Sequence, residues 1–381
     1  MTPVVPWTAP SPIAEVLAGI GRTEDVCFFA GGGRIAVAGY GRNVVQVLDV
    51  DITRDPAGDG EEATARINVT GIVELSCPAF DEPHGLHTLD DHTIVVANRS
   101  GDLVLVAAPP PRTEARSETV EPVLVLTCAE HGLTSPGSVA AARLAPDLYE
   151  IIVCNGGEAN TVSRHVIDTR GGYRVVGEEA FIRAGISVAD SVGLSPDRRW
   201  IAVSSHYTQC VLIYANSPSL DVESHASGVL QNVTYPHGVR FTADGRHVVV
   251  ADAGAPYVHV FARGDDWTGV YQPVATRRLM GDEVYLRGRT NPQEGGPKGI
   301  DLHPTLHLLA TTALHQELAF FDLRQILPDG DLSGPEVADE GELARIAILR
   351  AHDTSARTAA GSARTEQDLS AQLADAAASA A

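Results

Sequence analysis

Ionisable side chains recur at one position of a repeated sequence pattern, two residues before an apolar residue that opens a strand-like segment. Along the chain, and with one glycine among them, this position holds Glu24, His84, Gly137, Asp190, His237 and Lys298. Carboxylates and imidazoles are ligands of divalent metal ions, and a lysine can neutralise an anion or, when desolvated, act as a base or Schiff-base nucleophile. Charges gathered in a channel are costly unless they pair or hold a metal. The column therefore predicts a metal site, with a buried network of ion pairs as the alternative.

The predicted metal ligands are Glu24, Asp190 and His237, with His84 as a fourth candidate. Oxygen ligands favour Ca²⁺ or Mg²⁺, whereas imidazoles shift the preference toward Zn²⁺, Mn²⁺ or Fe²⁺, so the identity of the divalent metal ion stays open. His84 and His237 are also candidate catalytic bases. Lys298 is a candidate for catalysis and for binding a substrate anion, and its pairing with a carboxylate is the alternative.

A second column of polar residues closes the second strand-like segment of the repeats. It holds Asn98, Asn155, His206 or Ser205, Asp252 and Thr312. Because an antiparallel neighbour returns toward the start of the first strand, we expect this column to reach the same end of the channel. Asn98, Asn155 and His206 are candidate substrate-binding residues, and Asp252 is a further candidate base.

Both columns belong to one repeated unit of four short strands. The unit is clearest in "VADSVGLSPDRRWIAVSSH" (188–206) and "YPHGVRFTADGRHVVVAD" (235–252), and six copies follow one another at a spacing of 47 to 61 residues. Repeats of this length are typical of propellers and other arrays. Four antiparallel strands per copy predict an all-β, six-bladed β-propeller with a central channel, and seven blades are the alternative. In such a fold the first strand of each blade lines the channel.

The repeats divide the chain into three parts. We expect residues 1–22 to be an N-terminal extension, residues 23–353 to be one propeller domain, and residues 354–381 to be an Ala-rich, flexible tail. Residues 281–297 lead directly into the innermost strand of the sixth unit and form a candidate lid over the channel.

Composition narrows the range of partners. The chain has 381 residues, with 49 acidic against 28 basic residues and a net charge of −21, which argues against nucleic acid because phosphate binding needs clustered Lys and Arg. No signal-like start and no long apolar window occur, so we expect a cytoplasmic protein without a membrane partner. The partner that remains is a small-molecule substrate. Five scattered cysteines are expected to be reduced.

The repeat pattern "PHGVRFTADGRHVVVAD" resembles that of six-bladed propellers of the gluconolactonase and senescence-marker-protein family, over roughly residues 23–353. It resembles more loosely the NHL-repeat, streptogramin-lyase and lactonase-like propellers. In the first family a divalent metal is held by a Glu, an Asn and an Asp from different blades. By this resemblance Glu24 would be the first ligand, while Asp190 and His237 stand where Asn and Asp are expected. Streptogramin lyases use a channel histidine as base beside Mg²⁺, a part that His84 or His237 would take.

Two classes of function follow. The first is a metal-dependent enzyme that acts on a small molecule at the channel mouth. Such an enzyme would suit a tailoring step in secondary metabolism. As a lactonase, it would use the metal to polarise a carbonyl and activate water, with Asp252 or a histidine as base; as a lyase or isomerase, it would stabilise an enolate while His84 or His237 removes a proton. The second class is a non-catalytic binding or scaffold propeller, which would show aromatic and Arg-rich loops. An aromatic content of 5% favours the enzyme.

Overall fold

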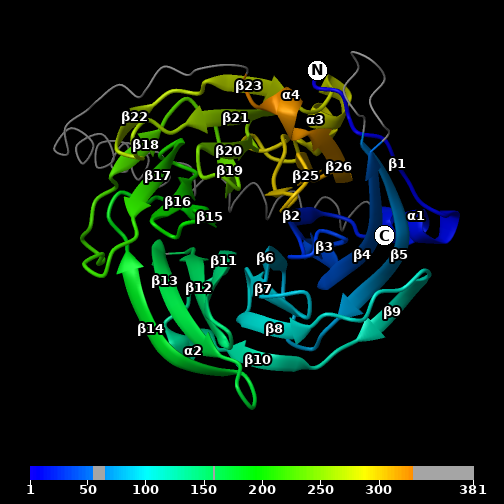
Figure 1. Ribbon diagram of the computed structural model, residues 1–381, viewed down its shortest axis with the longest axis horizontal. Coiled ribbons are helices and arrows are strands. Elements are labelled where there is room, and N and C mark those ends of the chain that lie inside the picture. The colour runs from blue at the N-terminus through cyan, green and yellow to red at the C-terminus, as the bar shows by residue number, and fades with distance from the viewer. Residues whose placement is uncertain (55–64, 158, 329–381) are drawn as a thin grey trace, which may run out of the picture.

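The computed structural model describes residues 1–54, 65–157 and 159–328, and these residues form a six-bladed β-propeller (Figure 1). The prediction of six blades is confirmed, and seven blades are not found in the described ranges. The predicted tail at 354–381 lies outside the described residues, as do residues 55–64, 158 and 329–353 of the predicted propeller domain.

Each blade is a small antiparallel sheet whose first strand lies nearest the axis. Blade 1 holds β2 (Thr23–Phe28), β3 (Arg34–Gly39), β4 (Val44–Arg54) and β5 (Ala65–Ser76), and blade 2 holds β6 (Pro83–Thr88), β7 (Thr93–Asn98), β8 (Leu103–Ala107) and β10 (Pro122–Leu126). Blade 3 holds β11 (Pro136–Ala145), β12 (Leu148–Asn155), β13 (Thr161–Asp168) and β14 (Arg174–Ile182), and blade 4 holds β15 (Ala189–Leu194), β16 (Trp200–Ser205), β17 (Cys210–Ala215) and β18 (Gly228–Leu230). Blade 5 holds β19 (Pro236–Phe241), β20 (His247–Asp252), β21 (Tyr257–Ala262) and β23 (Ala275–Arg278), and blade 6 holds β24 (Ile300–Leu302), β25 (Leu308–Ala313) and β26 (Gln316–Asp322).

The blades are stabilised by apolar side chains that both faces of each sheet bury against the neighbouring blades. Strands such as β3 and β16 are buried along their whole length, which explains why their sequences are nearly continuous apolar runs. One apolar cluster fills each interface between adjacent blades; Ile152 of blade 3, for example, shares a cluster with Val203 of blade 4. Each buried aliphatic side chain contributes about 1.5–3 kcal/mol to this packing.

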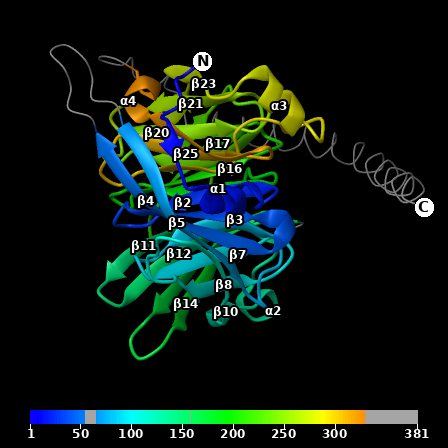
Figure 2. The same cartoon turned by 90° about the vertical axis from the view of Figure 1, so that its right-hand side faces the viewer.

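The N-terminal residues join the last blade to the first. Val4 pairs antiparallel with Phe321 of β26, and the Val5 amide donates to the Phe320 carbonyl at 2.8 Å. The chain then adds β1 (Trp7–Thr8), parallel to β5, and α1 (Ser11–Ala18), which packs Ile13 and Leu17 into the apolar cluster between blades 6 and 1 (Figure 2). Blade 6, which otherwise has three strands in the described chain, is thus completed by the N-terminus.

Further short elements decorate the rim. Two strands cross to the preceding blade, β9 (Ala115–Thr119) to β5 and β22 (Gly269–Tyr271) to β18, both parallel. The helices are η1 (Tyr40–Arg42), α2 (Cys128–His131), α3 (Asp282–Gly288) and α4 (Leu323–Ile326). No described helix is both long enough and apolar enough to cross a membrane. All five cysteines are free, and all but Cys128 are buried.

Candidate metal centre at the channel mouth

The first strands bring the first polar column together around the axis. Glu24, His84, Asp190 and His237 are each the second residue of their strand and are between 0% and 6% exposed. In blades 1 to 5 the pairing of the first two strands shifts register at this position. Such β-bulges re-aim side chains, and here two consecutive residues of the first strands of blades 1, 3, 4 and 5 line one cavity. We call Glu24, His84, Gly137, Asp190, His237 and Lys298 the polar ring.

On one side of the polar ring, Glu24 is paired with permanent cations. The Lys298 ammonium donates to both Glu24 oxygens, at 2.8 and 3.0 Å, and lies 2.9 Å from Glu294. The Arg22 guanidinium also bonds to Glu24. Burial raises the pKa of Glu24, but Lys298 and the nearby imidazoles outweigh burial, so the pKa lies well below its ordinary value. Burial lowers the pKa of Lys298, but its two glutamates reverse this and raise it.

On the other side, Asp190 faces imidazoles. Asp190 Oδ2 lies 3.1 Å from His237 Nδ1 and 3.3 Å from His206 Nε2, and Oδ1 lies 3.8 Å from His84 Nε2. Among the described residues neither Asp190 Oδ2 nor His206 Nε2 has a hydrogen bond of good geometry, although both atoms are buried. Burial raises the pKa of Asp190, but His206 and His237 outweigh it and hold the pKa well below its usual range.

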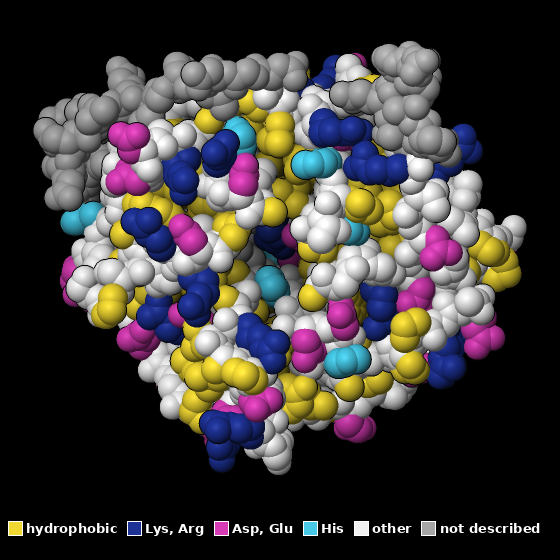
Figure 3. Space-filling model, viewed as in Figure 1, with side chains coloured by type: hydrophobic (Ala, Val, Ile, Leu, Met, Phe, Trp, Pro, Cys, Tyr) yellow, Lys and Arg dark blue, Asp and Glu magenta, His cyan; other side chains and the backbone are white. Residues whose placement is uncertain are grey.

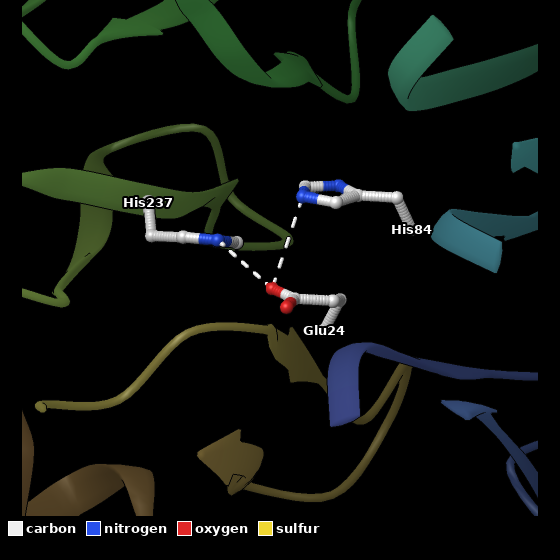
Figure 4. A group of neighbouring side chains, drawn as sticks. All are labelled: Glu24, His84 and His237. Carbon is white, nitrogen blue, oxygen red and sulfur yellow. Dashed lines mark ion pairs between the residues drawn. The ribbon is translucent and has the colours of Figure 1, made fainter. Parts of the chain in front are cut away.

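His237 joins the two sides. Its Nε2 lies 3.5 Å from Glu24 Oε2, while its Nδ1 faces Asp190, as Figure 4 shows for the Glu24 side. Burial lowers the pKa of His237, but the two carboxylates raise it above its ordinary value. Glu24 therefore orients the His237 imidazole by accepting from Nε2. Nδ1 is left directed at Asp190.

The tautomer of His84 is fixed by the backbone. Its Nδ1 lies 2.6 Å from the Gly137 carbonyl oxygen, which can only accept, so Nδ1 carries a proton. Burial and then Arg99 lower the pKa of His84 to about 4, and the neutral ring directs the lone pair of Nε2 into the polar ring. His84 Nε2 lies 3.8 Å from Glu24 Oε2 and 3.8 Å from Asp190 Oδ1. Nε2 and the two carboxylate oxygens are thus three acceptors that face the same space.

Beneath the polar ring, the next residue of each first strand binds the blades to one another. These residues are Asp25, Gly85, Ser138, Ser191, Gly238 and Gly299. Asp25 accepts the Leu86 amide, and the Ser138 and Ser191 hydroxyls accept amides of the following blade. The layer holds small residues because the strands converge: a Cβ on Gly85 would lie 2.5 Å from the Ser138 Cα. Burial raises the pKa of Asp25 to about 6.

Space inside the channel is limited. The cavity between the two layers, lined by Glu24, His84, Asp190 and His237 among others, measures about 10 Å³ in space open to the centre of a water molecule. This is close to the smallest volume that holds one water. Figure 3 shows a central hollow at one end of the channel. The interior therefore admits a water or an ion and is too small for an organic substrate.

The second polar column mostly anchors loops. Asn98 accepts the Asp81 amide, Asn155 accepts the Thr134 amide, and Ser205 accepts the Ser187 amide. Asp252 accepts the amides of Thr234, Tyr235 and Gly254 and lies 3.2 Å from His259. In each case the side chain holds the loop that precedes the first strand of its own blade. Thr312 Oγ1 is buried and has no hydrogen-bond partner among the described residues. Only His206, one residue beyond the strand, reaches the polar ring.

Three charged residues near the polar ring carry no sequence signal of the repeat: Arg22, Arg99 and Glu294. Arg99 follows β7, and its Nη1 lies 3.9 Å from Asp190 Oδ1. Glu294 comes from the 281–297 segment, which forms α3 and then returns to blade 5, where two of its amides donate to the Ala253 carbonyl. The glycine at position 137 was the one available hint, because it leaves a gap in the ring that another residue must fill.

The chain matches no family model and no curated protein. Solved structures that resemble it include a protein of unknown function from Desulfotomaculum acetoxidans, 15% identical over 84% of this chain and 86% of that one, with a TM-score of 0.50. A luciferin-regenerating enzyme is 12% identical over 86% and 98% of the two chains, with a TM-score of 0.49. The β-propeller domain of Cps50 (Swd1) from Myceliophteria thermophila is 14% identical over 79% and 96%, with a TM-score of 0.44. At these identities, the likeness is one of fold.

Proposed function

We propose that this propeller is a metal-dependent hydrolase of a small lactone or similar ester, with the metal held by Asp190, His206 and His237. The observation that carries the proposal is the pair of orphaned atoms on the Asp190 side, Asp190 Oδ2 and His206 Nε2, which are buried 3.3 Å apart without good hydrogen bonds. Buried polar atoms without partners are costly, and a cation between them removes the cost.

The donor set fits a metal ion in number, and the two distances from Asp190 fit one in spacing. The atoms that Asp190, His206 and His237 offer all lie within 4.8 Å of one another, and the oxygen of Asp190 is 3.1 and 3.3 Å from the two nitrogens. Two ligands of one Zn²⁺ at bonds of about 2.1 Å can be up to about 4.2 Å apart. Two imidazoles and one carboxylate favour Zn²⁺, Mn²⁺ or Fe²⁺ over Ca²⁺. When bound, such an ion polarises a carbonyl oxygen and acidifies water.

The remaining residues of the polar ring serve the reaction without holding the ion. His84 Nε2 accepts a proton, because Nδ1 is occupied by the Gly137 carbonyl and the lone pair points into the water-sized cavity. Glu24 orients His237 from the other side, and a carboxylate behind a metal-binding histidine is a common support. Lys298 is committed to Glu24 and Glu294 and keeps Glu24 ionised. This commitment argues against Lys298 as a Schiff-base nucleophile, which requires a neutral amine.

Hydrolysis is favoured over elimination by the size of the cavity beside His84. A water fits next to Nε2, whereas the carbon atom from which a lyase takes its proton would have to enter the same 10 Å³. Asp252, fully bonded to backbone amides and His259, leaves the role of base to His84.

The test is metal content by elemental mass spectrometry of protein purified without chelator, for wild type, Asp190→Asn and Glu24→Gln. The two variants make the same charge change on the two sides of the polar ring. We expect about one equivalent of Zn²⁺, Mn²⁺ or Fe²⁺ in wild type, loss in Asp190→Asn, and retention with about 10- to 100-fold weaker affinity in Glu24→Gln. The reverse pattern would move the site to Glu24, His84 and His237, which also lie close enough to hold an ion.

Activity is tested on a panel of five- and six-membered lactones with the metal-loaded protein. His84→Gln should keep the metal and lose hydrolysis by about 10²–10⁴-fold, the usual contribution of a general base. A wild-type protein that neither contains nor takes up a metal would end the proposal. Elimination products in place of hydrolysis would keep the metal site and assign the lyase reaction.

A further inference from the structure

Arg99 occupies the gap that Gly137 leaves in the polar ring. A Cβ on Gly137 would lie 2.3 Å from Arg99 Nη1, so the guanidinium lies where a side chain of blade 3 would otherwise be. The backbone of Arg99 is fixed on both sides, because its amide donates to the Glu82 carbonyl at 2.9 Å and its carbonyl accepts the Ser135 hydroxyl at 2.7 Å. The guanidinium is therefore positioned at the ring by the fold of the loop.

The Arg99 guanidinium has a donor to spare. Nη1 is buried and has no hydrogen-bond partner among the described residues, since Asp190 Oδ1 lies 3.9 Å away. The side chain as a whole is 24% exposed, so part of it contacts solvent although Nη1 itself does not. Arginine offers five N–H donors in a planar fork that matches a carboxylate. By contrast, the donors of Lys298 all face glutamates.

Aromatic rings line the same mouth, although the chain is poor in them. The Tyr235 ring stacks on His206 with centroids 3.9 Å apart, and Tyr207 meets Tyr235 edge-on at 6.4 Å. Across the mouth, Tyr40 lies edge-on to His84 at 6.1 Å. These tyrosines are partly exposed. Flat, partly exposed rings favour a flat ligand, because stacking needs a planar partner.

We propose that the mouth binds a small organic carboxylate that carries a planar group, with the carboxylate on Arg99 and the planar group against Tyr235. The inference rests on the proposed function for the location of the substrate, and it adds the substrate class: a lactone or ester with a free carboxylate and an unsaturated or aromatic part. Charge-assisted hydrogen bonds between a guanidinium and a carboxylate are stronger than neutral ones.

The probe is 4-fluorobenzoate, with binding followed by ¹⁹F NMR, and its neutral counterpart is 4-fluorobenzyl alcohol. The proteins are wild type, Arg99→Gln, Tyr235→Leu and the control Arg199→Gln, which removes the same charge from an exposed hairpin of blade 4. We expect wild type and Arg199→Gln to bind the carboxylate at least 10-fold more tightly than the alcohol. Arg99→Gln should abolish that preference, and Tyr235→Leu should weaken both probes alike. Cyclohexanecarboxylate, which is not planar, should compete weakly.

Any of these results would overturn the inference: equal affinity for the two probes, unchanged carboxylate binding in Arg99→Gln, or no binding at millimolar concentration. Inorganic phosphate as the tighter, Arg99-dependent ligand would also overturn it, in favour of a phosphorylated substrate. Metal content, measured on each sample, separates the two proposals. A protein without metal that binds 4-fluorobenzoate through Arg99 would end the proposed hydrolase and keep this site, and a metal-loaded protein indifferent to the probe would do the opposite.

Discussion

The two sides of the polar ring bury one carboxylate each and treat it differently. Glu24 and Asp190 are 0% and 2% exposed, so burial does not distinguish them. Glu24 has two permanent cations within bonding distance, and both of its oxygens are occupied by Lys298. Asp190 has imidazoles at 3.1 to 3.8 Å, with one oxygen lacking a good hydrogen bond. The two carboxylates therefore differ in their pairing and not in their depth.

This difference predicts different roles for the two sides of the polar ring. A carboxylate paired with lysine has its charge neutralised in the fold itself, so we expect Glu24 to contribute stability and the orientation of His237. A carboxylate that faces imidazoles can bind a metal ion together with them, because a neutral imidazole is itself a metal ligand. The predictions that follow test whether the Glu24 side carries stability and the Asp190 side carries binding.

The largest effect is expected for Lys298→Met. The substitution leaves Glu24 and Glu294 without the ammonium that lies 2.8 and 2.9 Å from them. Breaking a buried ion pair in this way costs about 3–5 kcal/mol of unfolding free energy, which urea denaturation measures. Adding Glu24→Gln to Lys298→Met should recover a large part of the loss, since the uncompensated charge is gone. A single variant as stable as wild type would show that the pair is not structural.

Metal binding should appear as stability on the Asp190 side. A free metal concentration of 100 times Kd stabilises a folded protein by about 2.7 kcal/mol. Wild type and Glu24→Gln should both show this gain in urea denaturation when each is given metal at 100 times its own Kd, and Asp190→Asn should not. A gain in Asp190→Asn equal to that of wild type would contradict the division between the two sides.

The fold and the polar ring followed from the sequence because both are local and repeated. The same register irregularity recurs where the first strand of each of the first five blades starts, so one aligned position predicts one place in space. Glu24, Asp190 and His237 were thereby placed together from residues more than 200 positions apart. The lactonase-like resemblance beyond the propeller fold stays a prediction.

The second column and the mouth could not be read in the same way. Asn98, Asn155 and Asp252 each accept amides of a loop, and a structural need that repeats produces the same sequence pattern as a functional one, so their candidate roles in binding and catalysis stay predictions. Arg99 and Glu294 come from loops whose course depends on tertiary contacts. Their roles are therefore invisible until the loops are placed.

Two glycine-to-alanine substitutions test whether the backbone beside Lys298 is more rigid than the surroundings of Gly137. On Gly299, beside Lys298, a Cβ would lie 2.5 Å from the backbone Cα of Asp25, and backbone cannot move cheaply. We expect Gly299→Ala to cost about 1–3 kcal/mol, as overpacking does. On Gly137 the close contact is the tip of Arg99, a flexible side chain, so Gly137→Ala should cost less than about 1 kcal/mol and mainly weaken 4-fluorobenzoate. Equal stability losses in urea denaturation would show that both sides are equally rigid.

The last prediction concerns a histidine outside the polar ring, which sets the baseline for pH studies of the ring itself. His165 of β13 is buried, bonds to the Ser163 hydroxyl at 3.0 Å, and has a pKa that burial lowers to about 4, against the pull of Glu178. Because its pKa in the unfolded chain is about 6.5, the unfolded state binds more protons between these values, and stability falls as pH drops below 6.5. From pH 7 to 5.5, wild type should lose about 1 kcal/mol more than His165→Gln, which keeps a hydrogen-bonding side chain but does not titrate. Urea denaturation at the two pH values measures the difference, and parallel losses would assign the acid sensitivity to other groups, the polar ring foremost among them.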